Sequence, residues 1–292
     1  MISTLFELLI LGIFLGTTYG LIALGLSLIF GVQYVINIAH GEFVMLGAYA
    51  TFFGWSVLNL HPLISTVLAI PLLFAFGALI QDQLIERITD KPEITSLILT
   101  FGLAIFLMNT AQALFSADYR SIGYLTSPVT FGGATIAGNR IVTFIGTALA
   151  LAAILGFIKY TNWGKAIRAT SQAPEIAKAC GIYTRKVRIL AFGIGAATAG
   201  FAGSFIGMMY QIFPDMGFNY LIKAFVIVVL GGLGSLAGAV AGGLIFGILE
   251  TFGTYYLDGA TANALAFLIL VGLLLVYPQG LLGKEDPSVG GQ

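Results

Sequence analysis

The sequence predicts an all-α integral membrane protein, a polytopic bundle of about eight or nine transmembrane helices with one or two broken or re-entrant segments. Of its 292 residues, 58% are hydrophobic and only 9% are charged, whereas about 25% of the residues of soluble domains are charged. So few charges cannot cover a surface that faces water. Apolar stretches of about 20 residues, the length that crosses a bilayer as a helix, recur along the chain. These observations exclude a soluble enzyme, a disordered chain and a small secreted domain held by disulfides.

The first apolar stretch is longer than the core of a signal peptide and no Lys or Arg precedes it, so we expect it to remain as a span. No linker rich in proline, serine or charge divides the chain, and residues 1–292 are expected to form a single transmembrane domain. The expected spans cover residues 5–31, 42–60, 63–81, 95–115, 141–160, 189–213, 236–257 and 262–282.

Two shorter stretches do not fit a plain span. Residues 31–41 (GVQYVINIAHG) are too polar to lie in lipid, and residues 221–235 (LIKAFVIVVLGGLGS) are too short and end in glycines. Irregular backbone at membrane depth is tolerated only where protein or a water-filled cavity surrounds it. Both stretches are therefore predicted to be broken or re-entrant elements.

Basic residues gather in one connection of the chain. Seven of the 13 Lys and Arg residues lie between positions 159 and 188. Because basic residues in short loops mark the cytoplasmic side of a membrane protein, this segment is expected to be cytoplasmic. Counting back along the spans puts 82–94 inside, and 116–140 and the N-terminus outside, provided that 31–41 does not cross. The side on which the C-terminus lies depends on whether 221–235 crosses, and both readings stay open.

Glycine is about twice as frequent as in an average protein, with 38 residues, or about 13% of the chain. Small residues at every fourth position let two helix backbones approach closely inside a membrane, where lipid provides no hydrophobic drive. We therefore expect most of these glycines to serve helix packing. The series with this spacing are Gly12, Gly16 and Gly20; Gly195, Ala199, Gly203 and Gly207; and Gly234, Gly238 and Gly242.

The first candidate for function is the polar segment that opens the second span. Asn37, His40 and Glu42 are costly groups to place beside hydrocarbon, and polar residues there are functional candidates by default. An alternative is a helix start at the membrane interface. In that reading, Glu42 lies in the first turn, where a carboxylate stabilises the positive end of the helix dipole by roughly 0.3–1 kcal/mol. The residues alone leave both readings open.

The second candidate is the glycine-rich break that precedes the span 236–257. Its residues Gly231, Gly232, Gly234 and Ser235 resemble a phosphate-binding loop only superficially. The pattern GxxxxGK[ST], whose backbone amides and lysine hold nucleotide phosphates, occurs nowhere in the chain. The sequence therefore predicts no hydrolysis of ATP by a P-loop mechanism, and the break stays a candidate for a translocation pathway.

The third candidate is a short helix inside the basic loop 161–188. Pro174 stands at its first turn, Glu175 follows, and Gly181 stands just beyond its end. Proline at the start and glycine after the end are the typical boundaries of a helix. A helix isolated between two spans is available to dock a partner. The alternative is a plain cytoplasmic loop that binds nothing.

The side chains exclude several other kinds of site. Cys180 alone forms no internal disulfide, and His40 and His61 are too few for a zinc cluster. We therefore expect neither a metal nor a cofactor. With 13 basic and 13 acidic residues, the net charge is zero, which gives no case for binding nucleic acid. Asp215 and Glu250 are isolated charges near spans, and each fits a helix end as well as a pathway.

At these motifs the chain resembles a known family. The stretches GTTYGLIALGLSLIFGVQYVINIAHGEFVMLGAY, GKAIRATSQAPEIAKACGI and KAFVIVVLGGLGSLAGAVAGGLIFGILE, with the tail AFLILVGLLLVYPQGLLGKED, closely resemble the transmembrane permease subunits of branched-chain amino acid ABC importers. The resemblance implies a bacterial or archaeal cytoplasmic membrane protein. It implies a pair of like or unlike homologous permeases, two cytoplasmic ATPases and an extracytoplasmic solute-binding protein as partners.

The resemblance also assigns residues. Glu175, Ala177 and Gly181 stand at the positions of the ATPase-docking signature of such permeases, E-A-A followed by a glycine, and Ile176 departs from its first alanine. Under this reading, the segment Asn37–Glu42 and the break Gly231–Ser235 lie near the translocation pathway, where exposed backbone groups meet the solute.

Other functions compete with this reading. Permeases for urea or short-chain amides are very similar to this chain in the same three motifs, so such a permease is the main alternative. An ion-coupled secondary transporter would act as a single chain, would carry more carboxylates within its spans and would need no docking helix. A membrane enzyme is disfavoured because the sequence offers no set of nucleophile, base and orienting residue, and no metal cluster.

Overall fold

The computed structural model describes residues 2–257 apart from 90, 132 and 133, and a few positions beyond them: 259, 261, 264, 268, 272 and 280–282. Within these residues the chain is mostly helical. In chain order the elements are α1 (Ile2–Gln33), α2 (His40–Ser56), α3 (Pro62–Gln83), the 3₁₀ helix η1 (Ile85–Ile88), α4 (Glu93–Phe115), β1 (Pro128–Phe131), β2 (Ala134–Ala137), α5 (Gly138–Tyr160), α6 (Asn162–Gln172), α7 (Pro174–Ala179), α8 (Thr184–Met209), α9 (Met216–Gly231) and α10 (Leu236–Tyr256).

Six helices of the described residues are long and apolar enough to cross a membrane: α1, α3 with η1, α4, α5, α8 and α10. The predicted multi-pass helical membrane protein is thus confirmed. The predicted span 42–60 is a shorter helix, α2, of 17 residues, and the awkward stretch 221–235 contains the end of α9, a helix of 16 residues. Most of the predicted span 262–282 lies outside the described residues.

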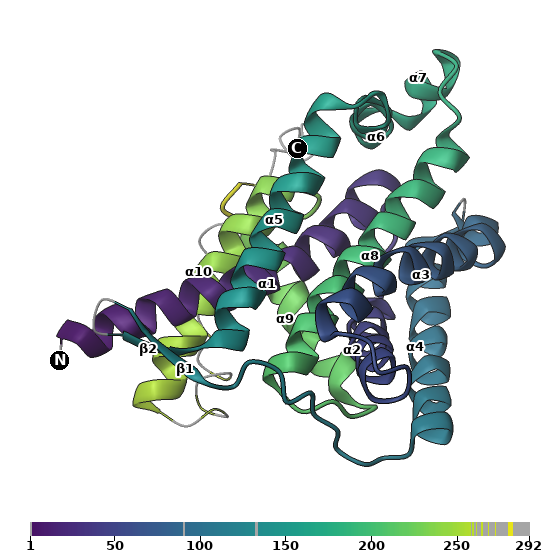
Figure 1. The fold of residues 1–292 in the computed structure, drawn as a ribbon. Helices are drawn as coiled ribbons and strands as arrows, with labels where there is room; N and C mark the ends of the chain where they lie inside the picture. Colours follow the sequence, from purple (N-terminus) through teal and green to yellow (C-terminus); the bar gives the residue numbers. More distant parts are fainter. Residues whose placement is uncertain are drawn as a thin grey trace.

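The expectation of helices alone was incomplete, because β1 and β2 form an antiparallel hairpin in which Pro128 pairs with Ala137. The hairpin lies near the N-terminus, at the opposite end of the bundle from α6 and α7 (Figure 1). We call these two ends the hairpin end and the basic end. The N-terminal part of α1 contacts the hairpin, since the N–H of Thr135 donates to Glu7 at 3.4 Å.

Ion pairs confirm which connections share the basic end. Arg185 at the start of α8 pairs with Asp82 at the end of α3, with 2.8 Å between Nη2 and Oδ1. Arg188 pairs in the same way with Glu86 of η1. The segments 82–94 and 159–188, expected on one side of the membrane, therefore lie together.

The glycines of α1 pack against α10, as their spacing predicts. A Cβ added to Gly16 would lie 2.7 Å from the Cα of Leu244, and one added to Gly12 would lie 2.8 Å from the Cα of Ile248. Glycines on α10 pack against those on α1, since a Cβ on Gly243 would meet the backbone of Gly20. At these glycines the backbones of the two helices are in direct contact.

The helix α8 forms the centre of the bundle, where it packs against α1, α2 and α3. Most of its residues are buried. A Cβ on Gly47 of α2 would meet the backbone of Gly200, and a Cβ on Gly203 would meet that of Val44. Phe43 and Phe192 are fully buried beside this crossing, with their rings 6.0 Å apart and nearly perpendicular. Close backbone packing and aromatic rings together fill the core.

A pair of glutamines joins α1 to α3 near the basic end. Gln33 donates from Nε2 to the Oε1 of Gln81 at 3.0 Å, and Gln81 donates back to the Oε1 of Gln33 at 2.8 Å. Both side chains are buried. Gln81 also donates to Glu86, which links the pair to the ion pair with Arg188.

We expect Gln81→Leu to destabilise the protein by about 1–3 kcal/mol, because it leaves the buried amide of Gln33 without its partner. The double variant Gln33→Leu/Gln81→Leu should regain most of this loss, since no buried amide is then left unpaired. The measurement is the free energy of unfolding in detergent micelles. Equal losses in the single and the double variant would contradict the expected pairing.

Candidate functional site

The chain breaks between α1 and α2 as the polarity of 31–41 predicts. Residues 34–39 are not helical. Thr100 of α4 supports this segment, since its hydroxyl lies 3.0 Å from the carbonyl oxygen of Ile36 and 3.2 Å from the amide nitrogen of Ile38. The Nε2 of His40 lies 2.9 Å from the carbonyl oxygen of Ile22, inside α1. The segment therefore leads back towards the middle of α1, and Thr100 satisfies two of its backbone groups.

The polar residues of this break are buried. Asn37 and His40 have no exposed surface, and Glu42 is 4% exposed. Glu42 lies in the first turn of α2, as expected, with its carboxylate against Gly217 of α9. Among the described residues, both polar atoms of the Asn37 side chain, the Nδ1 of His40 and the Oε2 of Glu42 have no hydrogen-bond partner. A helix start that faces water does not fit this burial.

The glycine-rich break lies elsewhere, in the turn between α9 and α10. Gly232 and Gly234 adopt φ angles of +100° and +76°, which favour glycine. Ser235 caps α10 by accepting a hydrogen bond from the N–H of Gly238 at 3.1 Å, and a Cβ on Gly231 would meet the backbone of that same glycine. The turn packs against Gly31 near the end of α1. This turn therefore lies towards the basic end.

The described contacts do not join the two candidate segments. The break at Asn37–Glu42 contacts the middle of α1, α4 and the start of α9, whereas Gly231–Ser235 contacts the ends of α1 and α10. Residues 280–282 lie beside this turn, since the N–H of Leu281 donates to the carbonyl of Leu230 at 2.8 Å. The helix α9 thus runs from the hairpin end towards the basic end, where 280–282 also lie.

The short helix α7 has the boundaries that its sequence predicts. Gly181 follows it with a φ of +84°. The N–H of Gly181 donates to the carbonyl of Lys178, and that of Ile182 to the carbonyl of Ala177, both at 3.0 Å. These two bonds are a Schellman motif. Ala177 is buried against the loop, while Glu175 is exposed at the basic end.

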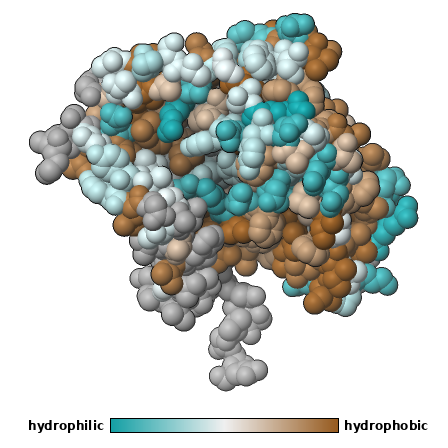
Figure 2. All heavy atoms as spheres, turned by 90° about the horizontal axis from the view of Figure 1, so that it is seen from below, coloured by the Kyte–Doolittle hydropathy of each residue, from teal (hydrophilic) through white to brown (hydrophobic). Residues whose placement is uncertain are grey.

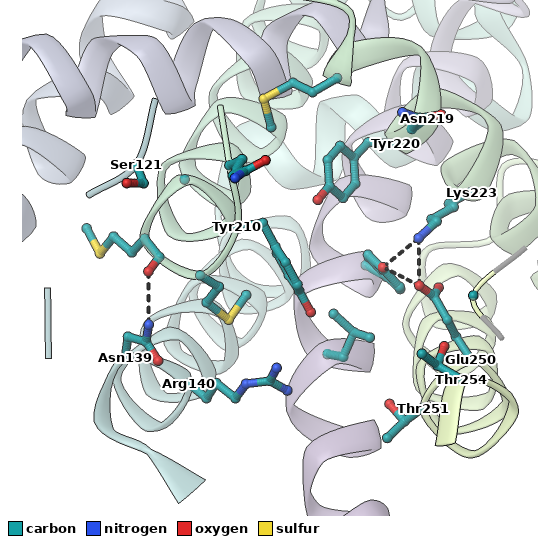
Figure 3. A pocket seen from close by; sticks show the side chains of 18 of the residues that line it. Ser121, Asn139, Arg140, Tyr210, Asn219, Tyr220, Lys223, Glu250, Thr251 and Thr254 are labelled. Carbon is teal, nitrogen blue, oxygen red and sulfur yellow. Dashed lines mark hydrogen bonds and ion pairs between the residues drawn. The ribbon is translucent and has the colours of Figure 1, made fainter. Parts of the chain in front are cut away.

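A pocket of about 1200 Å³ opens at the hairpin end. Its walls come from α1, the segment before the hairpin, the start of α5, the connection between α8 and α9, and the helices α9 and α10. Figure 2 shows this face of the molecule, where hydrophilic side chains surround a hollow between apolar surfaces. Figure 3 shows the polar side chains that point into it.

One wall of the pocket carries an ion pair from two apolar helices. The Nζ of Lys223 in α9 lies 2.7 Å from the Oε1 of Glu250 in α10. Lys223 also donates to the hydroxyl of Tyr19 at 2.9 Å, and this hydroxyl donates to the same Glu250 oxygen at 3.1 Å. Both charged side chains are mostly buried, with 17% and 14% of their surface exposed. The ammonium of Lys223 and the hydroxyl of Tyr19 together hold the carboxylate of Glu250 in one orientation.

Arg140 and Tyr210 face this wall from α5 and from the residue that follows α8 (Figure 3). The described residues provide no ion pair or hydrogen bond for the Arg140 side chain. Burial raises the pKa of the Tyr210 hydroxyl; Arg140 lowers this pKa and Glu250 raises it further. The pocket therefore contains a neutral hydroxyl near a carboxylate and a guanidinium that has no partner among the described residues.

Sequence reasoning did not bring these pocket residues together. Glu250 and Lys223 each interrupt an apolar helix, and this was the signal available. Arg140 is the last residue of the connection 116–140, which is expected outside, and the sequence gives it no role. The described residues contain no group of three His, Cys, Asp or Glu side chains that could hold a metal ion.

A helical membrane bundle that breaks beside buried polar side chains, and that opens a polar pocket at one end, is the architecture of a membrane transport protein. The chain belongs to the family described as "Branched-chain amino acid transport system / permease component", which it matches over residues 8–276. Members of this family are transport permeases and not enzymes.

Individual relatives agree with this assignment. The chain is 34% identical to the high-affinity branched-chain amino acid transport system permease protein LivH of Salmonella typhimurium, with 94% of each chain covered. It is 32% identical to the corresponding protein BraD of Pseudomonas aeruginosa, again with 94% of each covered. Its fold is similar to that of a chain in PsaBC from Streptococcus pneumoniae in complex with Fab, with a TM-score of 0.52, 15% identity, and 94% of this chain and 95% of that chain covered.

Proposed function

We propose that the chain is the membrane-spanning permease subunit of an ABC importer for branched-chain amino acids, in the cytoplasmic membrane of a bacterium or archaeon. The helix α7 is the observation that carries the coupling to ATPases. It stands exposed at the basic end with Glu175, Ala177 and Gly181 in the positions of a docking signature. Since the chain has no nucleotide-binding motif of its own, two separate ATPases supply the energy.

The loop 161–188 is proposed to be the cytoplasmic coupling element of a single permease domain, residues 1–292. The buried Ala177 anchors α7 to the loop, while Glu175 and Ile176 face outwards, towards an ATPase. A displacement of α7 is transmitted to the start of α8 through the four residues that connect the two helices. Because α8 packs against α1, α2 and α3, its displacement moves the centre of the bundle.

The membrane topology follows from the same proposal. The segment 34–39 together with α2 makes one crossing, and α9 makes another. With the six long helices and the predicted span 262–282, this gives nine spans, within the expected eight or nine. The solute-binding protein then docks at the hairpin end, and a second homologous permease lies alongside this one. An apolar hollow opens on the outer surface of the bundle between α4, α9 and the break. Ile36, Phe101 and Phe225 are among the residues that line it.

The segment Asn37–Glu42 is proposed to line the pathway, with Gly231–Ser235 as the turn at its cytoplasmic end. Burying polar side-chain atoms without partners costs about 1–3 kcal/mol for each group. The open hydrogen-bonding atoms of Asn37 and Glu42 support a role in contact with solute or water during transport.

We expect Asn37→Ala or Glu42→Ala to lower ATP-driven uptake by roughly tenfold while the complex still assembles, because each removes a polar group of the pathway and no structural hydrogen bond. Asn109→Ala is the matched control. Asn109 is exposed on α4 and only donates to its own helix, at the carbonyl of Ile105. Uptake is measured in vesicles, and normal uptake in both Asn37→Ala and Glu42→Ala would contradict the assignment.

The proposed function is tested with the complete importer in vesicles. The chain is reconstituted with its partner permease, the ATPases and the solute-binding protein, and the uptake of leucine is compared with that of urea and acetamide. We expect leucine uptake that requires ATP. Uptake of urea or acetamide in preference to leucine would favour an amide importer. Uptake driven by an ion gradient in vesicles that contain only this chain would favour a secondary transporter.

A further inference from the structure

Two charged side chains in the pocket at the hairpin end, Arg140 and Glu250, have hydrogen-bonding atoms without a partner among the described residues. The guanidinium of Arg140 has no ion pair or hydrogen bond among the described residues, although it lies in a hollow between helices (Figure 3). The Oε1 atom of Glu250 accepts hydrogen bonds from both Lys223 and Tyr19. The other oxygen, Oε2, is buried and has no partner among the described residues.

These groups complement the head of an α-amino acid. A guanidinium binds a carboxylate through two parallel hydrogen bonds, and a carboxylate oxygen accepts strong hydrogen bonds from an ammonium. An α-amino acid carries its carboxylate and its ammonium on one carbon atom, so both charges are presented together. Lys223 and Tyr19 orient the carboxylate of Glu250 through Oε1, which leaves Oε2 for a second cation.

The rest of the pocket suits the remainder of such a solute. Met208, Phe213, Met216 and Ile222 provide apolar and adaptable surface beside the charged wall. Small-molecule sites typically combine an apolar lining with a few polar groups that fix the orientation of the ligand. The pocket of about 1200 Å³ is wide enough for a branched aliphatic side chain together with water.

We propose that the permease itself binds the zwitterionic head of its solute in this pocket, with Arg140 on the α-carboxylate and the Oε2 of Glu250 on the α-ammonium. This inference rests on the proposed function and deepens it, because it gives the permease its own selection for α-amino acids. Urea and neutral amides carry neither charge and offer no counter-charge to Arg140 or to the Oε2 of Glu250, so this pocket binds them weakly.

The test uses the purified full-length permease in lipid nanodiscs and measures binding by calorimetry. The probes are L-leucine, 4-methylpentanoate, which lacks the ammonium, 3-methylbutylamine, which lacks the carboxylate, and acetamide. We expect leucine to bind better than the other three. Arg140→Gln should weaken leucine and 4-methylpentanoate binding by about 10- to 100-fold, the worth of a charged hydrogen bond, and should leave 3-methylbutylamine unchanged.

Glu250→Gln should give the converse pattern, a loss for leucine and the amine but not for 4-methylpentanoate. Because this change also disturbs the pair with Lys223, Arg140→Gln is the deciding variant: Arg140 has no described partner to lose. Arg87→Gln, an exposed arginine of η1 at the other end, is the matched control and should bind leucine like the wild type.

Two results would overturn the inference: unchanged leucine binding in Arg140→Gln, or no leucine binding by the wild-type permease while the complete importer takes up leucine. In both cases the proposed function survives. Failure of the complete importer to take up leucine is a different result, which would count against the proposed function itself.

Discussion

Gly47→Leu is expected to abolish the folded permease. A Cβ at this position would meet the backbone of Gly200 in α8, and no flexible side chain stands there to move away. Overpacking of a well-packed core costs about 1–3 kcal/mol where side chains can adjust. Since two backbones would have to separate here, we expect a loss of more than about 3 kcal/mol. Size-exclusion chromatography and thermal unfolding in detergent measure the outcome.

Gly102→Leu is the matched control for this change. Gly102 lies in α4, a helix of similar hydrophobicity, and nothing lies within 4 Å of a Cβ placed there. This variant should be purified and should unfold like the wild type. A folded and active Gly47→Leu permease would mean that α2 and α8 do not touch through their backbones.

Glu175→Arg is expected to stop ATP-driven uptake without unfolding the spans. The side chain is exposed in the first turn of α7, so the cost to the helix is the loss of a favourable dipole interaction, roughly 0.3–1 kcal/mol. The surface offered to an ATPase changes its charge by two units. We expect co-purification of the ATPases and uptake to fall by roughly tenfold or more, equivalent to about 1.4 kcal/mol or more of lost docking energy.

Two comparisons make this result specific. Asp118→Arg makes the same reversal at an exposed position of the connection after α4 and should retain the ATPases. Glu175→Gln removes the charge and keeps the helix, and should lie between the wild type and Glu175→Arg. Normal ATPase binding and normal uptake in Glu175→Arg would exclude α7 as the docking element.

Local chemistry explains what the sequence predicted well. The breaks at 31–41 and 231–235 are visible in the sequence because polar groups and glycines interrupt apolar stretches, and both are breaks in the structure. The end of α7 was predicted at Gly181 because a left-handed residue there favours glycine. These signals are confined to a few neighbouring residues.

Contacts between distant segments explain what was missed. Lys223 pairs with Glu250 only because α9 and α10 run antiparallel, and Arg140 enters the same pocket from α5. A single sequence does not fix which helices cross. The hairpin was missed for a different reason. Its signal lies in the sequence, since Gly132-Gly133 between two short runs rich in β-branched residues is typical of a hairpin turn. The prediction gives residues 116–140 only as a connection.

The glycine contacts of α8 have a consequence for motion. Where two backbones touch directly, as at Gly47 and Gly200, there are no rotamers to rearrange, so one helix cannot shift past the other in small steps. We therefore expect α2 and α8 to travel as one rigid body during a transport cycle. Hinges then lie in the described non-helical segments that flank these two helices, such as residues 34–39 before α2 and 210–215 after α8.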